Sequence, residues 1–231
     1  MIGINVSTSA AQAFSAIPGV GPFIKVLTIR QYIVKDDHHH ADIKVPGISN
    51  LNDKALELGL NEKYLAEGKA LYDQFQKDMG SAVNGHFGVD AGYIVKTDTD
   101  DIFAIARYVV TSAGSSSEER KYDTIDKKNQ ILLTLPLLFK DDRYIEVISD
   151  NIKKKMKDQM KADPVKTYDG KVPVETFKNI RADQNFFINA DGHLVISFNK
   201  YEVAPGYMGV QEFIIPTEVI ADLLLSRNYV K

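Results

Sequence analysis

The 231-residue chain contains no cysteine, and this absence removes several classes of chemistry at once. Without a thiol there is no cysteine nucleophile, no disulfide framework and no cysteine-ligated zinc or iron site. The sequence also has no run of about eighteen apolar residues, the length that a membrane-spanning helix requires. It therefore predicts a folded domain without thiol chemistry and without a membrane span within these residues.

The signature motifs of common enzymes are missing as well. The sequence has no G-x-S-x-G, H-E-x-x-H, G-x-x-x-x-G-K-[ST] or G-x-G-x-x-G motif. Asp98, Asp100 and Asp101 resemble the start of a calcium loop, but the glycine and the distal glutamate that complete such a loop do not follow. Residues 38–40 are all histidine, which places two imidazoles on one face of an extended chain, too few for a dedicated metal site. We expect a protein that is not an enzyme and has no metal, cofactor or catalytic residue.

The composition is that of an ordinary folded domain, with 44% apolar residues, 26% charged residues and a net charge of −3. This balance gives no reason to expect a nucleic-acid partner. Apolar residues repeat at helical spacing over 50–79, 141–160 and from 217 onward, and Asn50 or Asn52 is the expected cap of the first helix. Strand-like patterns occupy 23–34, 41–45, 86–96, 102–111, 120–126, 186–188, 193–201 and 210–215. The expected fold is α+β, an antiparallel sheet with helices packed on one face.

Two polar segments allow more than one interpretation. The small residues of 113–117, with Ser115 at their centre, predict an exposed loop that is either recognised by a partner or merely flexible. The second expected helix carries a lysine face opposite its apolar residues, formed by Lys153, Lys154, Lys155, Lys157 and Lys161. A charge run of this kind is usually a solvated face, and the alternative is an anion or membrane site.

The stretch from Tyr201 to Gly209 predicts the tip of a hairpin between the last two strands. Pro205 has the fixed φ of the first central position of a tight turn, and Gly206 tolerates the positive φ of a type II turn. Tyr207 and Met208 are then expected to point outward on a stiff tip, which suits insertion into another molecule's cleft. The alternative is that Tyr207 folds back onto the sheet as ordinary packing.

Residues 1–27 differ from the rest of the chain because they are nearly free of charge and rich in alanine, serine and glycine. Ser7, Thr8 or Ser9 is suited to cap a short helix. Within that helix, Ala11-Gln12-Ala13 has the small-x-small pattern found before signal-peptidase cleavage sites. The alternative is an alanine-rich helix with no processing role.

Several stretches together resemble one known family, the extracytoplasmic domain of the sigma-V type anti-sigma factors of Gram-positive bacteria. The resemblance covers nearly the whole chain. It rests on Asp126-Lys127-Lys128-Asn129, residues 131–139, Tyr201-Glu202-Val203-Ala204-Pro205-Gly206-Tyr207-Met208-Gly209, residues 213–216 and the N-terminal Ala10-Ala11-Gln12-Ala13.

The resemblance implies a receptor and inhibitor for lysozyme, with the lysozyme contacts at Ser115, Pro205, Gly206, Tyr207 and Met208. It also implies a membrane-proximal segment over 1–27, cut by signal peptidase between Ala13 and Phe14 with Ala11 as the second small residue, and a lysozyme-binding ectodomain over 28–231. A membrane helix and a cytoplasmic sigma-factor-binding segment are expected to precede Met1. The chain would then lie on the extracytoplasmic face of the cell membrane.

Another class of function remains open at this point. A cell-wall glycan-binding module would use exposed aromatic rings as stacking platforms for sugars. Tyr93, Tyr201 and Tyr207 are the tyrosines that would serve in such a module.

Overall fold

The computed structural model describes residues 24–81, 86–168 and 177–231. The helices are α1 (Lys54–Ser81), α2 (Arg143–Ala162) and α3 (Thr217–Ile220), and two short 3-10 helices are η1 (Leu135–Leu138) and η2 (Gly206–Met208). The strands are β1 (Lys25–Lys35), β2 (His39–Ser49), β3 (Phe87–Asp98), β4 (Ile102–Ala113), β5 (Ser115–Asp126), β6 (Ile131–Leu133), β7 (Phe186–Ile188), β8 (Leu194–Phe198) and β9 (Gln211–Ile215). In the described part of the chain, no helix combines the length and the apolar character needed to cross a membrane.

The strands form two sheets, one of six strands in the order β1-β2-β3-β4-β5-β6 and one of three in the order β7-β8-β9. The α+β class expected from the sequence is confirmed. The larger sheet is not wholly antiparallel, however, because β2 and β3 run parallel, with His39 opposite Phe87 and Ile43 opposite Ala91. The physical reason is α1, since a parallel pair needs a long crossover between its strands and a helix supplies it.

The chain divides into two compact units. The first comprises Met1–Ile94 and Arg107–Ser116, and the second comprises Val95–Ala106 and Ser117–Lys231. The boundary expected between residues 27 and 28 falls inside β1.

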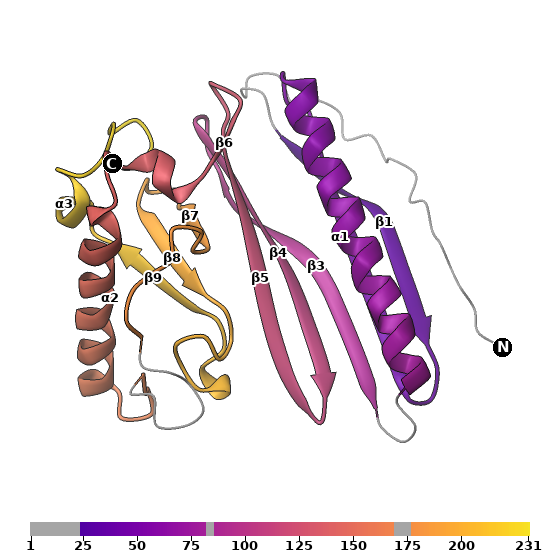
Figure 1. Ribbon diagram of the computed structural model, residues 1–231. Coiled ribbons are helices and arrows are strands. Elements are labelled where there is room, and N and C mark those ends of the chain that lie inside the picture. Colours follow the sequence, from indigo (N-terminus) through magenta and orange to yellow (C-terminus); the bar gives the residue numbers. More distant parts are fainter. Residues whose placement is uncertain (1–23, 82–85, 169–176) are drawn as a thin grey trace. The chain divides into compact units, whose positions relative to one another are not determined.

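In the first unit, α1 lies along β2 (Figure 1). The helix begins after Asp53, whose carboxylate accepts hydrogen bonds from the amides of Ala55 (2.9 Å) and Leu56 (3.0 Å), so the cap is Asp53 rather than Asn50 or Asn52. Asn61 on the helix fixes α1 to β2 by bonding both the backbone amide (2.7 Å) and the carbonyl (2.8 Å) of Ile48.

In the second unit, α2 packs against the β7-β8-β9 sheet (Figure 1). Ile148 and Ile152 on the helix and Ile196 on β8 are fully buried in one apolar core. Phe198 at the end of β8 packs edge to face on Phe213 of β9, with 5.8 Å between the ring centroids. This core supports the segment that joins β8 to β9.

Candidate functional site

Residues 199–210 connect β8 to β9 and are called the tip here. The two strands are antiparallel, with Leu194 opposite Ile215 and Phe198 opposite Gln211, so the expected hairpin is confirmed. The tip is not a two-residue turn. It contains the 3-10 helix η2, in which the Met208 amide donates to the Pro205 carbonyl at 2.9 Å.

Glu202 anchors the start of the tip. Its carboxylate accepts hydrogen bonds from the Asn199 amide at 2.7 Å, the Gln184 side chain at 3.0 Å and the Arg181 guanidinium at 2.9 Å. Gln184 is itself buried and donates to the Ser197 carbonyl at 2.9 Å, which ties the anchor to β8. Hydrogen bonds to a carboxylate are roughly twice as strong as those between neutral groups, so Glu202 holds the tip in one conformation.

The structure gives Gly206 a different role from the one expected. The φ angle of Gly206 is not positive, whereas Gly209 (φ 66°) and Tyr201 (φ 72°) both lie in the left-handed region. The type II turn expected at Pro205-Gly206 is therefore wrong. A Cβ atom at position 206 would overlap the Tyr201 ring, which lies directly against the glycine, so a larger residue here would have to displace the ring.

Tyr207 and Met208 occupy opposite environments. Tyr207 is 65% exposed, as expected from the sequence, and its hydroxyl donates a hydrogen bond to the Val165 carbonyl at 2.6 Å. Met208 does not point outward. It packs against the core, and its sulfur accepts a hydrogen bond from the Thr167 amide at 3.4 Å. The short 3-10 turn is the reason, because successive side chains on it point in different directions.

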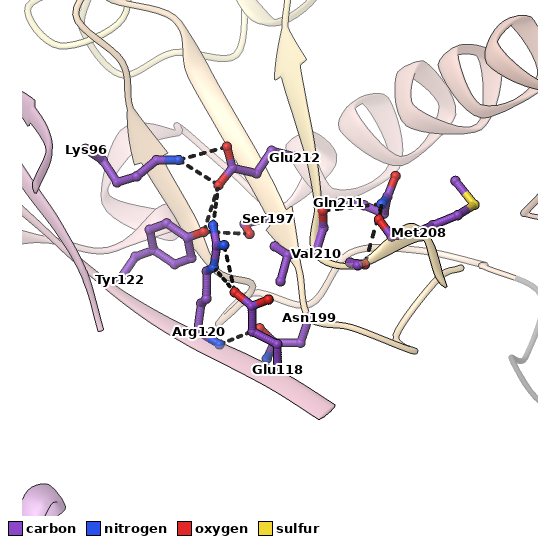
Figure 2. A network of polar contacts seen from close by, with 11 residues as sticks. Lys96, Glu118, Arg120, Tyr122, Ser197, Asn199, Met208, Val210, Gln211 and Glu212 are labelled. Atoms are coloured by element: carbon purple, nitrogen blue, oxygen red, sulfur yellow. Dashed lines mark hydrogen bonds and ion pairs between the residues drawn. The ribbon is translucent and has the colours of Figure 1, made fainter. Parts of the chain in front are cut away.

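A polar network fixes the hairpin to β3 and β5 (Figure 2). Glu212 on β9 accepts hydrogen bonds from Lys96 at 2.8 Å and from Tyr122 at 3.0 Å, and it lies 3.4 Å from the Arg120 guanidinium. The Tyr122 hydroxyl is also 2.9 Å from the Ser197 hydroxyl on β8. Because it donates to the carboxylate, it accepts from the serine. Burial raises the pKa of Tyr122 to about 12, so the phenol stays protonated at neutral pH.

The same network reaches the first residues of the tip (Figure 2). Asn199 accepts a hydrogen bond from the Arg120 amide at 2.8 Å, and the Arg120 side chain pairs with Glu118 at 2.7 Å. The Lys200 amide donates to the Glu118 carbonyl at 3.2 Å. The first residues of the tip are therefore bonded to β5, and sequence reasoning missed this support because the partners are far apart in the chain.

The raised pKa of Tyr122 predicts alkaline destabilisation. An unfolded tyrosine releases its proton near pH 10, whereas Tyr122 keeps its proton to about pH 12. Stability is therefore full below pH 10 and falls as the pH rises to 12, by about 2–3 kcal/mol from this residue. In Tyr122→Phe, the free energy of unfolding measured with urea should fall less between pH 10 and pH 12 than it does in the wild type. Tyr207→Phe, which removes an exposed hydroxyl, is the control and should show the same fall as the wild type. An equal fall in Tyr122→Phe and the wild type would contradict the assignment.

Ser115 lies in the first compact unit, whereas the tip lies in the second. Ser115 is exposed, but the loop expected over 113–117 is wrong. Strand β4 continues to Ala113 and β5 begins at Ser115, so only Gly114, with a φ of 76°, makes the turn. Strand pairing extended further than the small side chains suggested, because a positive φ at a single glycine was enough to reverse the chain.

The remaining predicted residues give no further cluster. The Tyr93 hydroxyl lies 2.9 Å from the Thr28 hydroxyl. Tyr93 belongs to the first unit, whereas Tyr201 and Tyr207 belong to the second. His39 lies 3.0 Å from the Asp36 carboxylate, and among the described residues no three histidine or acidic side chains are placed to hold a metal ion. Ala11, Ala13 and Phe14 lie outside the described residues.

The second unit contains a region shared with a known protein family, and the fold is shared with solved structures of that family. Residues 137–218, which contain α2, β7–β9 and the tip, match the family described as "Protein of unknown function (DUF3298)". The fold agrees with a DUF3298 family protein from Bacteroides fragilis (TM-score 0.62, 14% identity, 88% of this chain and 94% of the other). It agrees equally with one from Pseudomonas aeruginosa (TM-score 0.62, 12% identity, 85% and 90%). The protein is therefore of the DUF3298 fold class.

A curated relative identifies the family within this class. The anti-sigma-V factor RsiV of Bacillus subtilis (strain 168) is 48% identical over 229 residues, which is 99% of this chain and 80% of the relative. The chain belongs to the anti-sigma-V factor family. This confirms the resemblance indicated by the sequence.

Proposed function

We propose that this chain is the extracytoplasmic, lysozyme-sensing part of an anti-sigma factor. In this proposal it binds and inhibits lysozyme, and binding leads to signal-peptidase cleavage and to release of a sigma factor held by a cytoplasmic segment. Its support is the family membership together with the geometry of the tip. The chain acts as a receptor, and no catalytic residue is assigned to it.

The single observation that carries the proposal is an exposed tyrosine on a pre-ordered segment. Tyr207 projects from a tip that Glu202 anchors, and its hydroxyl is already hydrogen-bonded to the Val165 carbonyl. An aromatic side chain held in this way loses little conformational freedom on binding and buries a large area. These are the properties of a binding hot spot.

The other proposed contacts have distinct parts. Pro205 and Gly206 shape the backbone under Tyr207, and Met208 fixes it to the core. Ser115, exposed at the start of β5, is proposed as a second contact. Lysozyme is strongly cationic with an acidic, aromatic-lined cleft, so a chain of net charge −3 that presents an uncharged Pro-Gly-Tyr sequence suits both features.

Signal transmission is proposed to depend on access to residues 11–14. Signal peptidase needs an extended backbone with small residues, here Ala11 and Ala13, ahead of the cut before Phe14. A segment held against the rest of the chain is protected. Lysozyme shifts the population toward the accessible state only to the extent that it binds that state more tightly. Residues 1–27 are the proposed membrane-proximal segment and 28–231 the ectodomain, on the outer face of the cell membrane.

The test is calorimetric titration of the chain with lysozyme. Tyr207→Ala should weaken binding by about 2 kcal/mol, roughly thirtyfold, because it removes the exposed anchor. Leu225→Ala is the matched control, since Leu225 is 64% exposed against 65% for Tyr207 and lies in the same unit. Equal affinities of the two variants for lysozyme would show that Tyr207 and the tip are not part of the interface. A parallel pulldown with peptidoglycan fragments tests the glycan-binding alternative, which predicts capture of the glycan and none of lysozyme.

A further inference from the structure

The outer face of α2 carries a concentration of positive charge that the proposed function does not use. Five lysines lie within nine residues, and Lys154, Lys157 and Lys161 among them are exposed at positions i, i+3 and i+7. Residues at this spacing share one side of a helix. With a rise of about 1.5 Å per residue, they form a row of about 10 Å along the helix.

Four of the five lysines of this face make no ion pair with the described residues. Several lysines elsewhere pair with carboxylates, for example Lys69 with Asp73 and Lys96 with Glu212 at 2.8 Å. In the described part of the chain, Lys153 is the one lysine of this face in an ion pair, with Asp150 at 3.1 Å. The segment 150–161 has five lysines against two aspartates, whereas the whole chain has a net charge of −3. The positive charge is therefore local.

Helix stability accounts for only part of this arrangement. A lysine in the last turn interacts favourably with the partial negative charge at the helix C-terminus, and Lys161 is placed there. Lys154 and Lys157 lie more than one turn before Ala162, beyond the range of that effect. Neighbouring like charges on this face repel each other, and the exposed Asp158, at helical spacing from Lys154 and Lys161, offsets only part of that repulsion.

The shape of the face favours a linear polyanion over other anionic partners. The lysines stand on a convex helix surface, so they do not converge on a single small anion. Every isoleucine, valine and methionine of α2 packs into the core, which leaves no apolar side chain to insert into a bilayer. The one aromatic residue of the helix, Tyr144, is buried and cannot stack on a nucleobase.

We infer that this lysine face binds a hydrated linear polymer that carries one phosphodiester in each repeat. Lysine is a compact, flexible point charge that binds phosphate without fixed geometry. A row of such charges follows a flexible chain through several weak contacts. Binding of this kind releases counterions, so it weakens steeply with salt.

The test measures binding to synthetic poly(glycerol phosphate) by affinity electrophoresis at several salt concentrations. The triple variant Lys154→Gln, Lys157→Gln, Lys161→Gln should bind at least about tenfold more weakly at low salt, and its slope of log affinity against log salt should be shallower by about 2. The control is Lys25→Gln, Lys35→Gln, Lys77→Gln, which removes three exposed lysines that make no ion pair within the described residues. It changes the net charge equally and should bind as the wild type does.

Two further measurements compare the polymer with other molecules that carry phosphate. Glycerol phosphate monomer should compete only at far higher phosphate concentration than the polymer, and vesicles containing phosphatidylglycerol should bind wild type and triple variant alike. The inference is overturned if the wild type fails to bind the polymer at low salt or if the control loses as much affinity as the triple variant. Lysine-dependent binding to the vesicles without binding to the polymer would also overturn it. Circular dichroism melting and lysozyme titration should match the wild type in both variants, so a result here is independent of the tip.

Discussion

Glu202→Ala is expected to lower the free energy of unfolding by about 2–4 kcal/mol, because charge-assisted hydrogen bonds are lost and the buried Gln184 loses one of its two acceptors. The Glu202 carboxylate accepts hydrogen bonds from the Asn199 amide, the Gln184 side chain and the Arg181 guanidinium. Without this carboxylate the tip becomes mobile. Binding must then order the tip, and this entropic cost should weaken the proposed affinity for lysozyme by about tenfold or more. Urea unfolding and calorimetric titration measure the two effects.

The control for this change is Glu119→Ala. Glu119 is exposed on β5 and makes no ion pair or side-chain hydrogen bond with the described residues, so its replacement should change the free energy of unfolding by no more than about 0.5 kcal/mol. Glu202→Gln separates charge from hydrogen bonding, since the amide oxygen still accepts from the backbone of Asn199. An unfolding midpoint for Glu202→Ala equal to that of Glu119→Ala would show that the carboxylate does not anchor the tip.

Gly206→Ala is expected to destabilise the protein by about 1–3 kcal/mol, because the new methyl group overlaps the Tyr201 ring. The matched control is Gly59→Ala on α1, where a Cβ atom meets nothing within 4 Å. That substitution should stabilise the protein by about 0.5–1 kcal/mol, since alanine favours the helix over glycine. Thermal unfolding should thus move in opposite directions for the two variants.

A second substitution tests the cause of the clash. Tyr201→Ala removes the ring, so the double variant Gly206→Ala, Tyr201→Ala should lose less stability than the two single effects added together. Additive losses would show that the ring does not require glycine at position 206. Lysozyme titration of the same variants reports whether the tip has changed shape.

Local sequence patterns were sufficient for much of the fold. The alternation of apolar residues over 193–201 and 210–215 predicted the β8–β9 hairpin, and helical spacing predicted α1 and α2. The parallel β2–β3 pair was missed because strand direction depends on the path of the helix between the strands. A single strand's pattern holds no information about that path.

In the candidate site, too, local sequence patterns predicted some features and missed those that depend on distant residues. The sequence predicted an exposed Tyr207, because proline and glycine beside it mark a turn whatever surrounds them. It did not predict the burial of Met208, nor the support of β9 by Lys96 and Tyr122, which lie 116 and 90 residues from Glu212. A charged residue inside the tip, Glu202, was the signal that could have indicated an anchor.

The sequence by itself determined the α+β class, the family and the place of the tip, because these depend on periodicity and on motifs contiguous in the chain. Only the tertiary structure decided why Gly206 is glycine, which of two neighbouring side chains faces solvent, and which distant residues hold the tip. Those features depend on contacts between segments that come together only when the chain has folded.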